Sequence, residues 1–153
     1  DVERSRGLGD VYKRQVMKGQ EDLFSTVDIS ELDLYDGTCH FYKIGAAATF
    51  IRRNGIVECL ISTSLPVGVS YKLDMEKSEK DLYNGDFLVM VSDGVLEYLH
   101  VPNPEETMQE IIESIETNNA TILAKRILER VLLFTGGKAA DDMTVLATAI
   151  WEK

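Results

Sequence analysis

Apolar and polar residues alternate along the first half of the chain, with the two-residue period of β-strands that bury one face. The alternation over residues 27–34 predicts a strand, Asp36-Gly37 predicts a hairpin turn, and residues 39–44 predict the returning strand. Residues 49–61 predict a second hairpin, because Asn54-Gly55 lies between two runs of strand-forming residues. The first half of the chain is therefore expected to form antiparallel sheet.

The second half of the chain changes to longer apolar runs and to the spacing of amphipathic helices. Pro104 followed by two glutamates is typical of a helix start, and Gly136-Gly137 is typical of a helix stop. Residues 71–82 fit either a strand or a helical turn, and both interpretations stay open. The other expected elements are a buried strand over 87–91, a helical turn over 95–99, a helix over 104–115, a helix from a cap at Asn118 or Asn119 to Leu132, and a strand over 143–150. Hairpins, two C-terminal helices and a last strand predict an α+β layered fold with mainly antiparallel sheets.

Composition and charge narrow the class of protein. The 153 residues fit one domain, and 44% hydrophobic with 27% charged residues is typical of a globular chain. A formal charge of −10 repels phosphate backbones, so we expect no nucleic acid partner. No apolar run approaches the roughly 20 residues of a membrane helix, so no membrane segment is expected in this chain. Cys39 and Cys59 are too few for a disulfide framework and predict free thiols in a reducing, cytoplasmic compartment.

Residues 1–15 do not follow any structural period. The run over residues 9–15 resembles a translated sequencing-adapter scar, so residues 1–15 are left out of the fold prediction. A disordered native terminus is the alternative that composition leaves open. If residues 1–15 are a scar, residues 16–153 are the C-terminal part of a longer domain.

Two aspartate turns are the strongest chemical signal in the sequence. Residues 87–91 run directly into Ser92-Asp93-Gly94, and Asp141-Asp142-Met143-Thr144 opens the last apolar run. A carboxylate at the end of a buried strand lies where the sheet meets solvent. If the two strands are neighbours, their carboxylates come together as hard oxygen ligands, which suit Mg²⁺ or Mn²⁺. An Asp-Gly pair after a strand is more often only a turn, so the argument depends on the matched pair of turns.

These turns, taken with three earlier segments, carry a resemblance to a known family. In chain order the segments are residues 24–28 (FSTVD), 45–53 (GAAATFIRR), 65–68 (LPVG) with 85–88 (GDFL), and the two aspartate turns. The ordered set resembles the C-terminal part of a metal-dependent serine/threonine protein phosphatase of the PPM superfamily, in the branch typified by stage II sporulation protein E. The resemblance implies an αββα layered sandwich, here N-terminally truncated, that holds two Mn²⁺ or Mg²⁺ ions at one edge.

The resemblance also implies a role for each matched residue. Asp93 and Asp141 would be metal ligands. Asp142 would orient water or a group behind the ligands, or be a further ligand, and Gly94 would permit the tight exit from the strand. No catalytic residue beyond the metal ligands is implied. The implied reaction is hydrolysis of phosphoserine or phosphothreonine on a protein. In the sporulation branch that substrate is a phosphorylated anti-sigma-factor antagonist, whose dephosphorylation controls a sigma factor. The full-length proteins of that branch are membrane-anchored through segments absent from this chain.

The sequence also departs from the family pattern. The family has two further metal-binding aspartates in its N-terminal half, and residues 16–153 match neither of their motifs. Because each lost carboxylate removes charge from the site, this chain is expected to be inactive. The alternative is a non-catalytic regulatory module that kept the phosphatase-like fold and binds a protein.

Several other polar residues have plainer interpretations. Asp28, Asp33 and Asp36 are expected on the solvated face of a strand. The paired Arg52 and Arg53 could meet a phosphate, but paired basic residues at a hairpin end are usually solvated, so a solvated hairpin end is expected. His40 and His100 are isolated and show no zinc-ligand spacing. Residues 45–48 are small, which allows two backbones to pack closely there.

Overall fold

The computed structural model describes residues 24–69, 74–134, 136–137 and 142–151, and these form two antiparallel sheets with helices on one side. One sheet has three strands in the order β1-β2-β5, and the other has four in the order β4-β3-β6-β7. The strands are β1 (Val27–Leu32), β2 (Thr38–Ile44), β3 (Thr49–Arg53), β4 (Ile56–Leu60), β5 (Glu76–Asp81), β6 (Phe87–Val91) and β7 (Val145–Ala149). The helices are α2 (Asp93–Glu97), α3 (Pro104–Glu113) and α4 (Ala120–Leu133).

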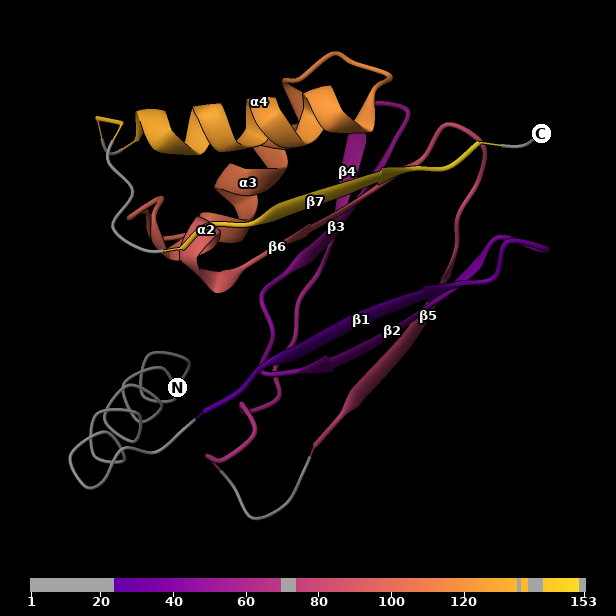
Figure 1. The fold of residues 1–153 in the computed structure, drawn as a ribbon, viewed down its shortest axis with the longest axis horizontal. Coiled ribbons are helices and arrows are strands. Elements are labelled where there is room, and N and C mark those ends of the chain that lie inside the picture. The colour runs from indigo at the N-terminus through magenta and orange to yellow at the C-terminus, as the bar shows by residue number, and fades with distance from the viewer. Residues whose placement is uncertain (1–23, 70–73, 135, 138–141, 152–153) are drawn as a thin grey trace.

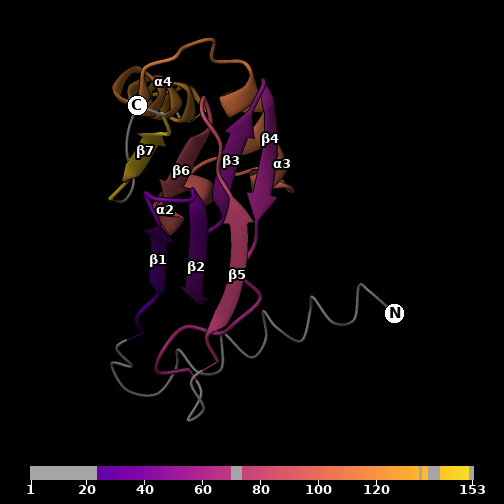
Figure 2. The same cartoon turned by 90° about the vertical axis from the view of Figure 1, so that its right-hand side faces the viewer.

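The described elements are stacked in three layers. The helices cover one face of the four-stranded sheet, and the three-stranded sheet faces its other side (Figure 1). Figure 2 shows β1, β2 and β5 side by side as the separate smaller sheet. The predicted α+β class with mainly antiparallel sheets is therefore confirmed. The segment over 71–82, which the sequence left open, contributes strand β5.

Strand β6 explains why the sequence has an unbroken apolar run at residues 87–91. The side chains of Phe87, Val89 and Val91 belong to the core between the four-stranded sheet and the helices. Leu88 belongs instead to the smaller core between the two sheets, together with Phe41 of β2. Because both faces of β6 are covered, nearly every position on this strand favours an apolar side chain.

The two long helices start where their capping signals predict. Proline occupies the first turn of α3, and the Asn119 side chain accepts the N–H of Ile122 at 3.0 Å at the start of α4. Past the end of α4, the N–H of Gly137 donates to the Leu132 carbonyl at 2.9 Å. The short helix α2 begins two residues earlier than the expected turn at 95–99, so Asp93 is its first residue.

Candidate metal centre

The two aspartate turns meet at one edge of the four-stranded sheet. Strands β6 and β7 are antiparallel neighbours, with Val91 opposite Val145. The pairing continues beyond both strands, because the N–H of Ser92 donates to the Thr144 carbonyl at 3.0 Å and the N–H of Thr144 donates to Ser92 Oγ at 3.0 Å. The residue after Ser92 is Asp93, so the end of β6 lies beside the segment that leads into β7.

Asp93 is exposed at this edge, at the first position of α2. The N–H of Gly94 donates to Asp93 Oδ1 at 2.9 Å, which helps to fix the orientation of the carboxylate. The Gly94 backbone does not adopt a positive φ, so the interpretation of Gly94 as a residue needed for an unusual turn has no support in its backbone angle. Gly94 is instead buried at the second position of the helix.

The other predicted ligand, Asp141, lies outside the described residues, so its pairing with Asp93 stays a prediction. Asp142 is described and is exposed just before β7. Mn²⁺ and Mg²⁺ prefer carboxylate oxygens as ligands. The exposed carboxylates of Asp93 and Asp142 are therefore chemically suitable for such an ion. Within the described part of the chain, however, no three His, Cys, Asp or Glu side chains are close enough to hold a metal together.

A buried ion pair lies at the same end of the sheets, and the sequence-based interpretation of Asp28 was wrong. Asp28 does not lie on a solvated face: it stands opposite Lys43 on neighbouring strands, and Lys43 Nζ is 2.8 Å from Asp28 Oδ2. Lys43 Nζ also donates to the Ala47 carbonyl at 2.7 Å, and Thr49 Oγ1 donates to Asp28 Oδ2 at 3.2 Å. Thr49 pairs with Met90 of β6, three residues before Asp93. The pair therefore links the two sheets near the strand ends of the candidate centre.

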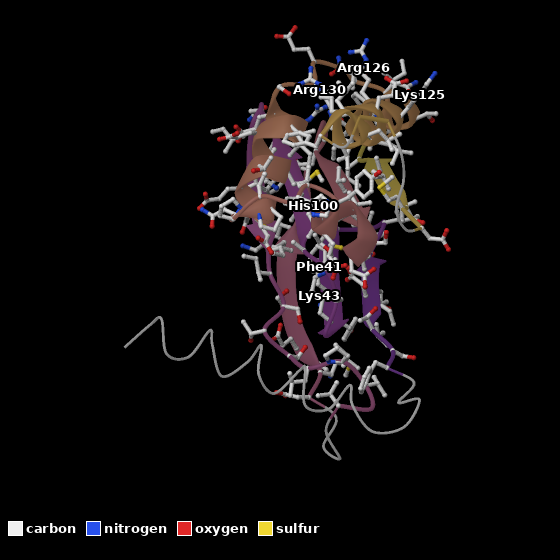
Figure 3. All side chains as sticks on the ribbon, turned by 90° about the vertical axis from the view of Figure 1, so that its left-hand side faces the viewer. Phe41, Lys43, His100, Lys125, Arg126 and Arg130 are labelled. Carbon is white, nitrogen blue, oxygen red and sulfur yellow. The ribbon has the colours of Figure 1, made fainter. Side chains whose placement is uncertain are left out.

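The burial of this pair follows from the side-chain alternation along β2. Cys39, Phe41 and Lys43 are all buried on that strand, whereas the residues between them are partly exposed. Figure 3 labels Phe41 and Lys43 low on the sheets, far from Lys125, Arg126 and Arg130 on α4. In the sequence, Lys43 occupies a position where the alternation along residues 39–43 predicts a buried side chain. This was the signal of a buried ion pair that the sequence analysis missed.

Arg52 and Arg53 also differ from the solvated hairpin end that the sequence suggested. The Arg52 guanidinium is buried over the Phe87 ring at 4.3 Å and donates to the carbonyls of Ile115 at 2.7 Å and Thr117 at 2.5 Å. Burial lowers the pKa of Arg52. These contacts lie near the start of β6, at the opposite end of the strand from Asp93.

Arg53 forms a second structural contact near that end. Its guanidinium makes hydrogen bonds to both oxygens of the buried Asp86 carboxylate, with a closest distance of 2.6 Å, and this interaction raises the pKa of Arg53. Neither arginine is placed to meet a phosphate at the candidate metal centre.

Comparison with known proteins identifies what the chain is similar to. The sequence model of the family named stage II sporulation protein E matches residues 5–150, a range that begins within residues 1–15. The stage II sporulation protein E of Bacillus subtilis (strain 168) is 33% identical over 135 residues, which cover 88% of this chain and 16% of that protein. The protein of the same name from Priestia megaterium is 33% identical over 150 residues, which cover 97% of this chain and 26% of that protein. The chain thus spans about a quarter or less of these curated relatives.

Solved structures show the same relationship. The Mn-presoaked phosphatase domain of the B. subtilis protein matches with a TM-score of 0.76 and 30% identity, covering 90% of this chain and 62% of that one. Its PP2C phosphatase domain with a fragment of the regulatory domain matches with a TM-score of 0.77 and 33% identity, covering 86% of this chain and 40% of that one. The catalytic domain of the serine/threonine protein phosphatase PstP in complex with two manganese ions matches at 16% identity with a TM-score of 0.62, covering 94% of this chain and 66% of that one, which supports the fold alone.

Proposed function

Because the chain belongs to the stage II sporulation protein E family of PPM-type protein serine/threonine phosphatases, we propose that it forms the C-terminal part of a metal-dependent catalytic domain. The proposed reaction is hydrolysis of phosphoserine or phosphothreonine on a protein. The observation that carries this proposal is the pairing of Ser92 with Thr144, which brings the Asp93 turn beside the segment that includes Asp142. Exposed carboxylates at a rigid sheet edge are suitable for a site that must admit both a metal ion and a phosphoprotein.

In this proposal Asp93 and Asp141 hold Mn²⁺ or Mg²⁺, and Asp142 orients water or a neighbouring group. The family site holds two ions, which when bound lower the pKa of a water molecule and stabilise charge on the phosphoryl oxygens. The chain's own contribution is to present carboxylates from positions fixed by backbone pairing. The Gly94 N–H bond to Asp93 Oδ1 restricts the rotation of that carboxylate. Manganese is supported by the Mn-presoaked structure of the related B. subtilis domain.

The substrate that we propose is a phosphorylated anti-sigma-factor antagonist, whose dephosphorylation would release a sigma factor during sporulation. Similarity to two sporulation proteins supports this choice. Cys39 and Cys59 are free thiols in the structure, which supports a reducing compartment such as the cytoplasm. Among the described residues, no helix has both the length and the apolar character needed to cross a bilayer.

We also propose that the 153-residue chain by itself has little or no activity. Residues 16–153 match two of the family's aspartate motifs and lack the two from its N-terminal half. With fewer carboxylates, a divalent ion is held by less negative charge, and binding weakens. The incomplete ligand set also favours a second candidate function, a non-catalytic module that kept the fold and binds a protein.

Metal binding and turnover should be measured separately. Binding of Mn²⁺ to the chain is followed through the electron paramagnetic resonance signal of the free ion, for wild type, Asp93→Asn, Asp141→Asn and the control Asp74→Asn. We expect weak binding that both site variants reduce and the control leaves unchanged, and little hydrolysis of p-nitrophenyl phosphate. Equal binding by all four proteins would remove Asp93 and Asp141 from the site. Robust Mn²⁺-dependent turnover by wild type would instead overturn only the proposal that the chain is inactive.

A further inference from the structure

A hollow of about 670 Å³ lies at the end of the sheets opposite the candidate metal centre. It is lined by the hairpin turn at residues 32–37, the turn at 82–84, and residues 150–151 after β7. Strand β6 begins next to this hollow and runs toward Asp93, so its five residues separate the two places by roughly 15 Å. A ligand of peptide size in the hollow would leave the metal centre accessible.

The walls of the hollow concentrate exposed aromatic side chains. The exposed large aromatic residues in the described part of the chain are Tyr35, Tyr83, Phe134 and Trp151, and all of these except Phe134 line the hollow. Tyr35 is 99% exposed and Trp151 is 58% exposed. Tyrosine and tryptophan are enriched where proteins bind other proteins, because they supply large contact areas with few rotatable bonds.

The segments that line the hollow are held together by backbone hydrogen bonds. The N–H of Leu82 donates to the Gly37 carbonyl at 2.9 Å, and the N–H of Gly85 donates to the Ile150 carbonyl at 2.8 Å. Gly37 has a φ of +83°, and a Cβ atom there would lie 2.6 Å from the Leu82 carbonyl oxygen, so this close approach requires glycine. The backbone of the turns that line the hollow is thus fixed, which lowers the part of the entropy cost of binding that comes from ordering the chain.

The charged side chains that line the hollow are both acidic. Asp33 Oδ1 accepts the N–H of Tyr35 at 2.7 Å, and Asp36 Oδ1 accepts the N–H of Thr38 at 2.8 Å. The hydrogen bonds from Thr38 lower the pKa of Asp36, and both carboxylates are charged at neutral pH, as exposed aspartates ordinarily are. The apolar part of the lining comes from Leu32, Leu82 and Ile150, which also pack against the core between the sheets.

A contact within the protein shows that an aromatic ring of the hollow can bind a cationic side chain. The Arg53 guanidinium lies over the Tyr83 ring at 4.4 Å, and its charge is balanced by the buried Asp86. The charges of Asp33 and Asp36 are not balanced in this way by a cation among the residues that line the hollow. Aromatic faces beside carboxylates attract a second cation, while the apolar lining favours an aliphatic neighbour.

We propose that this aromatic hollow (Tyr35, Tyr83 and Trp151 with Asp33 and Asp36) binds a segment of a partner protein that presents a lysine or arginine beside an aliphatic side chain. The cation lies against the aromatic rings near the two carboxylates, and the aliphatic group contacts the apolar lining. Because the hollow is at the opposite end of the sheets from Asp93, the proposal does not depend on phosphatase activity.

Trp151 is the only tryptophan in the chain, so its fluorescence reports on the hollow directly. The probe is a blocked peptide of repeated Leu-Arg units, titrated into the 153-residue chain and compared with a Leu-Glu peptide of the same length. We expect a saturable change in Trp151 emission with the Leu-Arg peptide and at least about tenfold weaker binding of the Leu-Glu peptide, as electrostatic complementarity requires.

Two variants separate the charge from the rings. Asp33→Asn combined with Asp36→Asn keeps an oxygen acceptor for each turn and removes both charges, so we expect a several-fold loss of affinity and a weaker salt dependence. Tyr35→Ala should weaken binding by about tenfold, as truncation of an interface aromatic does. Asp74→Asn and Phe134→Ala are controls outside the hollow and should leave binding unchanged.

Three results would overturn the proposal. The first is the absence of a saturable change in Trp151 emission, and the second is equal binding of the Leu-Arg and Leu-Glu peptides. The third is binding that neither Tyr35→Ala nor the double Asn variant alters. Sedimentation analysis of the free chain gives a further check, because dimers that dissociate on Tyr35→Ala while the peptide fails to bind would identify a second copy as the occupant instead.

Discussion

Lys43 and Asp28 form an ion pair of 2.8 Å on neighbouring strands of the three-stranded sheet, and the Lys43 side chain is only 5% exposed. Asp28 Oδ1 is buried and has no hydrogen-bond partner among the residues that the structure describes, so Lys43 provides most of the compensation for that carboxylate. Removing one member of a buried pair is costly because it leaves the other charge uncompensated, whereas replacing both by apolar groups costs much less. A comparison of the two single variants with the double variant can therefore separate the cost of an unpaired buried charge from the net contribution of the ion pair.

We expect Lys43→Met to lower the free energy of unfolding by about 3 kcal/mol, since Asp28 then lies unpaired between the sheets. Asp28→Leu combined with Lys43→Met should be more stable than the Lys43→Met variant, although Thr49 and the Ala47 carbonyl lose their partners. Urea unfolding of wild type and the three variants, including Asp28→Leu alone, gives these values. A double variant less stable than both single variants would contradict a charge-based cost.

The buried Arg52 leads to a second prediction. Lysine carries a charge but cannot reach both the Ile115 and Thr117 carbonyls with a planar fork. We therefore expect Arg52→Lys to lower the free energy of unfolding by about 2 kcal/mol, because a buried acceptor is left without its charged donor. Urea unfolding measures this change, and Arg126→Lys on the exposed face of α4 is the matched control with an effect below about 0.5 kcal/mol. Equal effects of the two substitutions would show that burial of Arg52 is not important.

The sequence predicted the elements well where a local signal determines them. The Asn54-Gly55 turn, the Pro104 start and the Asn119 cap each depend on neighbouring residues, and each was found as expected. The adjacency of the Asp93 turn and the 142–144 segment followed from two apolar runs that became neighbouring strands. The strands themselves were indicated by short stretches of chain, whereas their pairing joins residues about fifty positions apart and was stated only as a condition.

The Asp28–Lys43 pair could not be predicted in the same way, because its register depends on the length of the first hairpin turn. A two-residue turn at Asp36-Gly37 would place Asp28 opposite Gly45. The observed turn is longer, with Asp33 and Gly37 bonded to each other at 2.9 Å, and it places Asp28 opposite Lys43. The burial of Arg52 likewise depends on Ile115 and Thr117, more than sixty residues away.

Gly45 lies where the sequence suggested close backbone packing, and it provides a third prediction. Its φ is +57°, and an added Cβ would lie 2.5 Å from the backbone nitrogen of Pro66. Gly55 has a φ of +82° with open space around it. We expect Gly55→Ala to cost about 1 kcal/mol from backbone strain alone and Gly45→Ala to cost at least about 2 kcal/mol more, because packed backbone must move. Thermal and urea unfolding of the two variants measure these losses of stability. Equal losses for Gly45→Ala and Gly55→Ala would show that the Cβ at position 45 does not clash with Pro66.

The two cysteines predict slow thiol chemistry. Burial raises the pKa of Cys39 and of Cys59 to about 11, so little of either thiol is ionised at pH 8. We expect Ellman's reagent to react with the folded chain about a hundredfold more slowly than with the chain in urea. Cys59→Ser isolates Cys39, which is fully buried and should react more slowly than Cys59 in the Cys39→Ser variant. Rapid labelling of folded Cys39 would contradict its position in the core.

The hydrogen bonds to Glu76 lead to the prediction that part of the free energy of unfolding is lost in acid. The N–H and the hydroxyl of Thr63 donate to Glu76 Oε1 at 2.8 and 2.6 Å, and these bonds lower the pKa of the carboxyl group. A carboxyl whose pKa is lower in the folded state stabilises the fold above its unfolded pKa and loses that contribution as pH falls through the folded pKa. The stability advantage of wild type over Glu76→Gln should therefore be present at pH 7, begin to fall near the ordinary glutamate pKa of about 4.3, and be lost as pH falls further through the folded pKa. Urea unfolding across this range measures it, with Asp74→Asn, an exposed carboxylate just before β5, as the control. An advantage that persists unchanged at pH 3 would show that the charge of Glu76 is not its source.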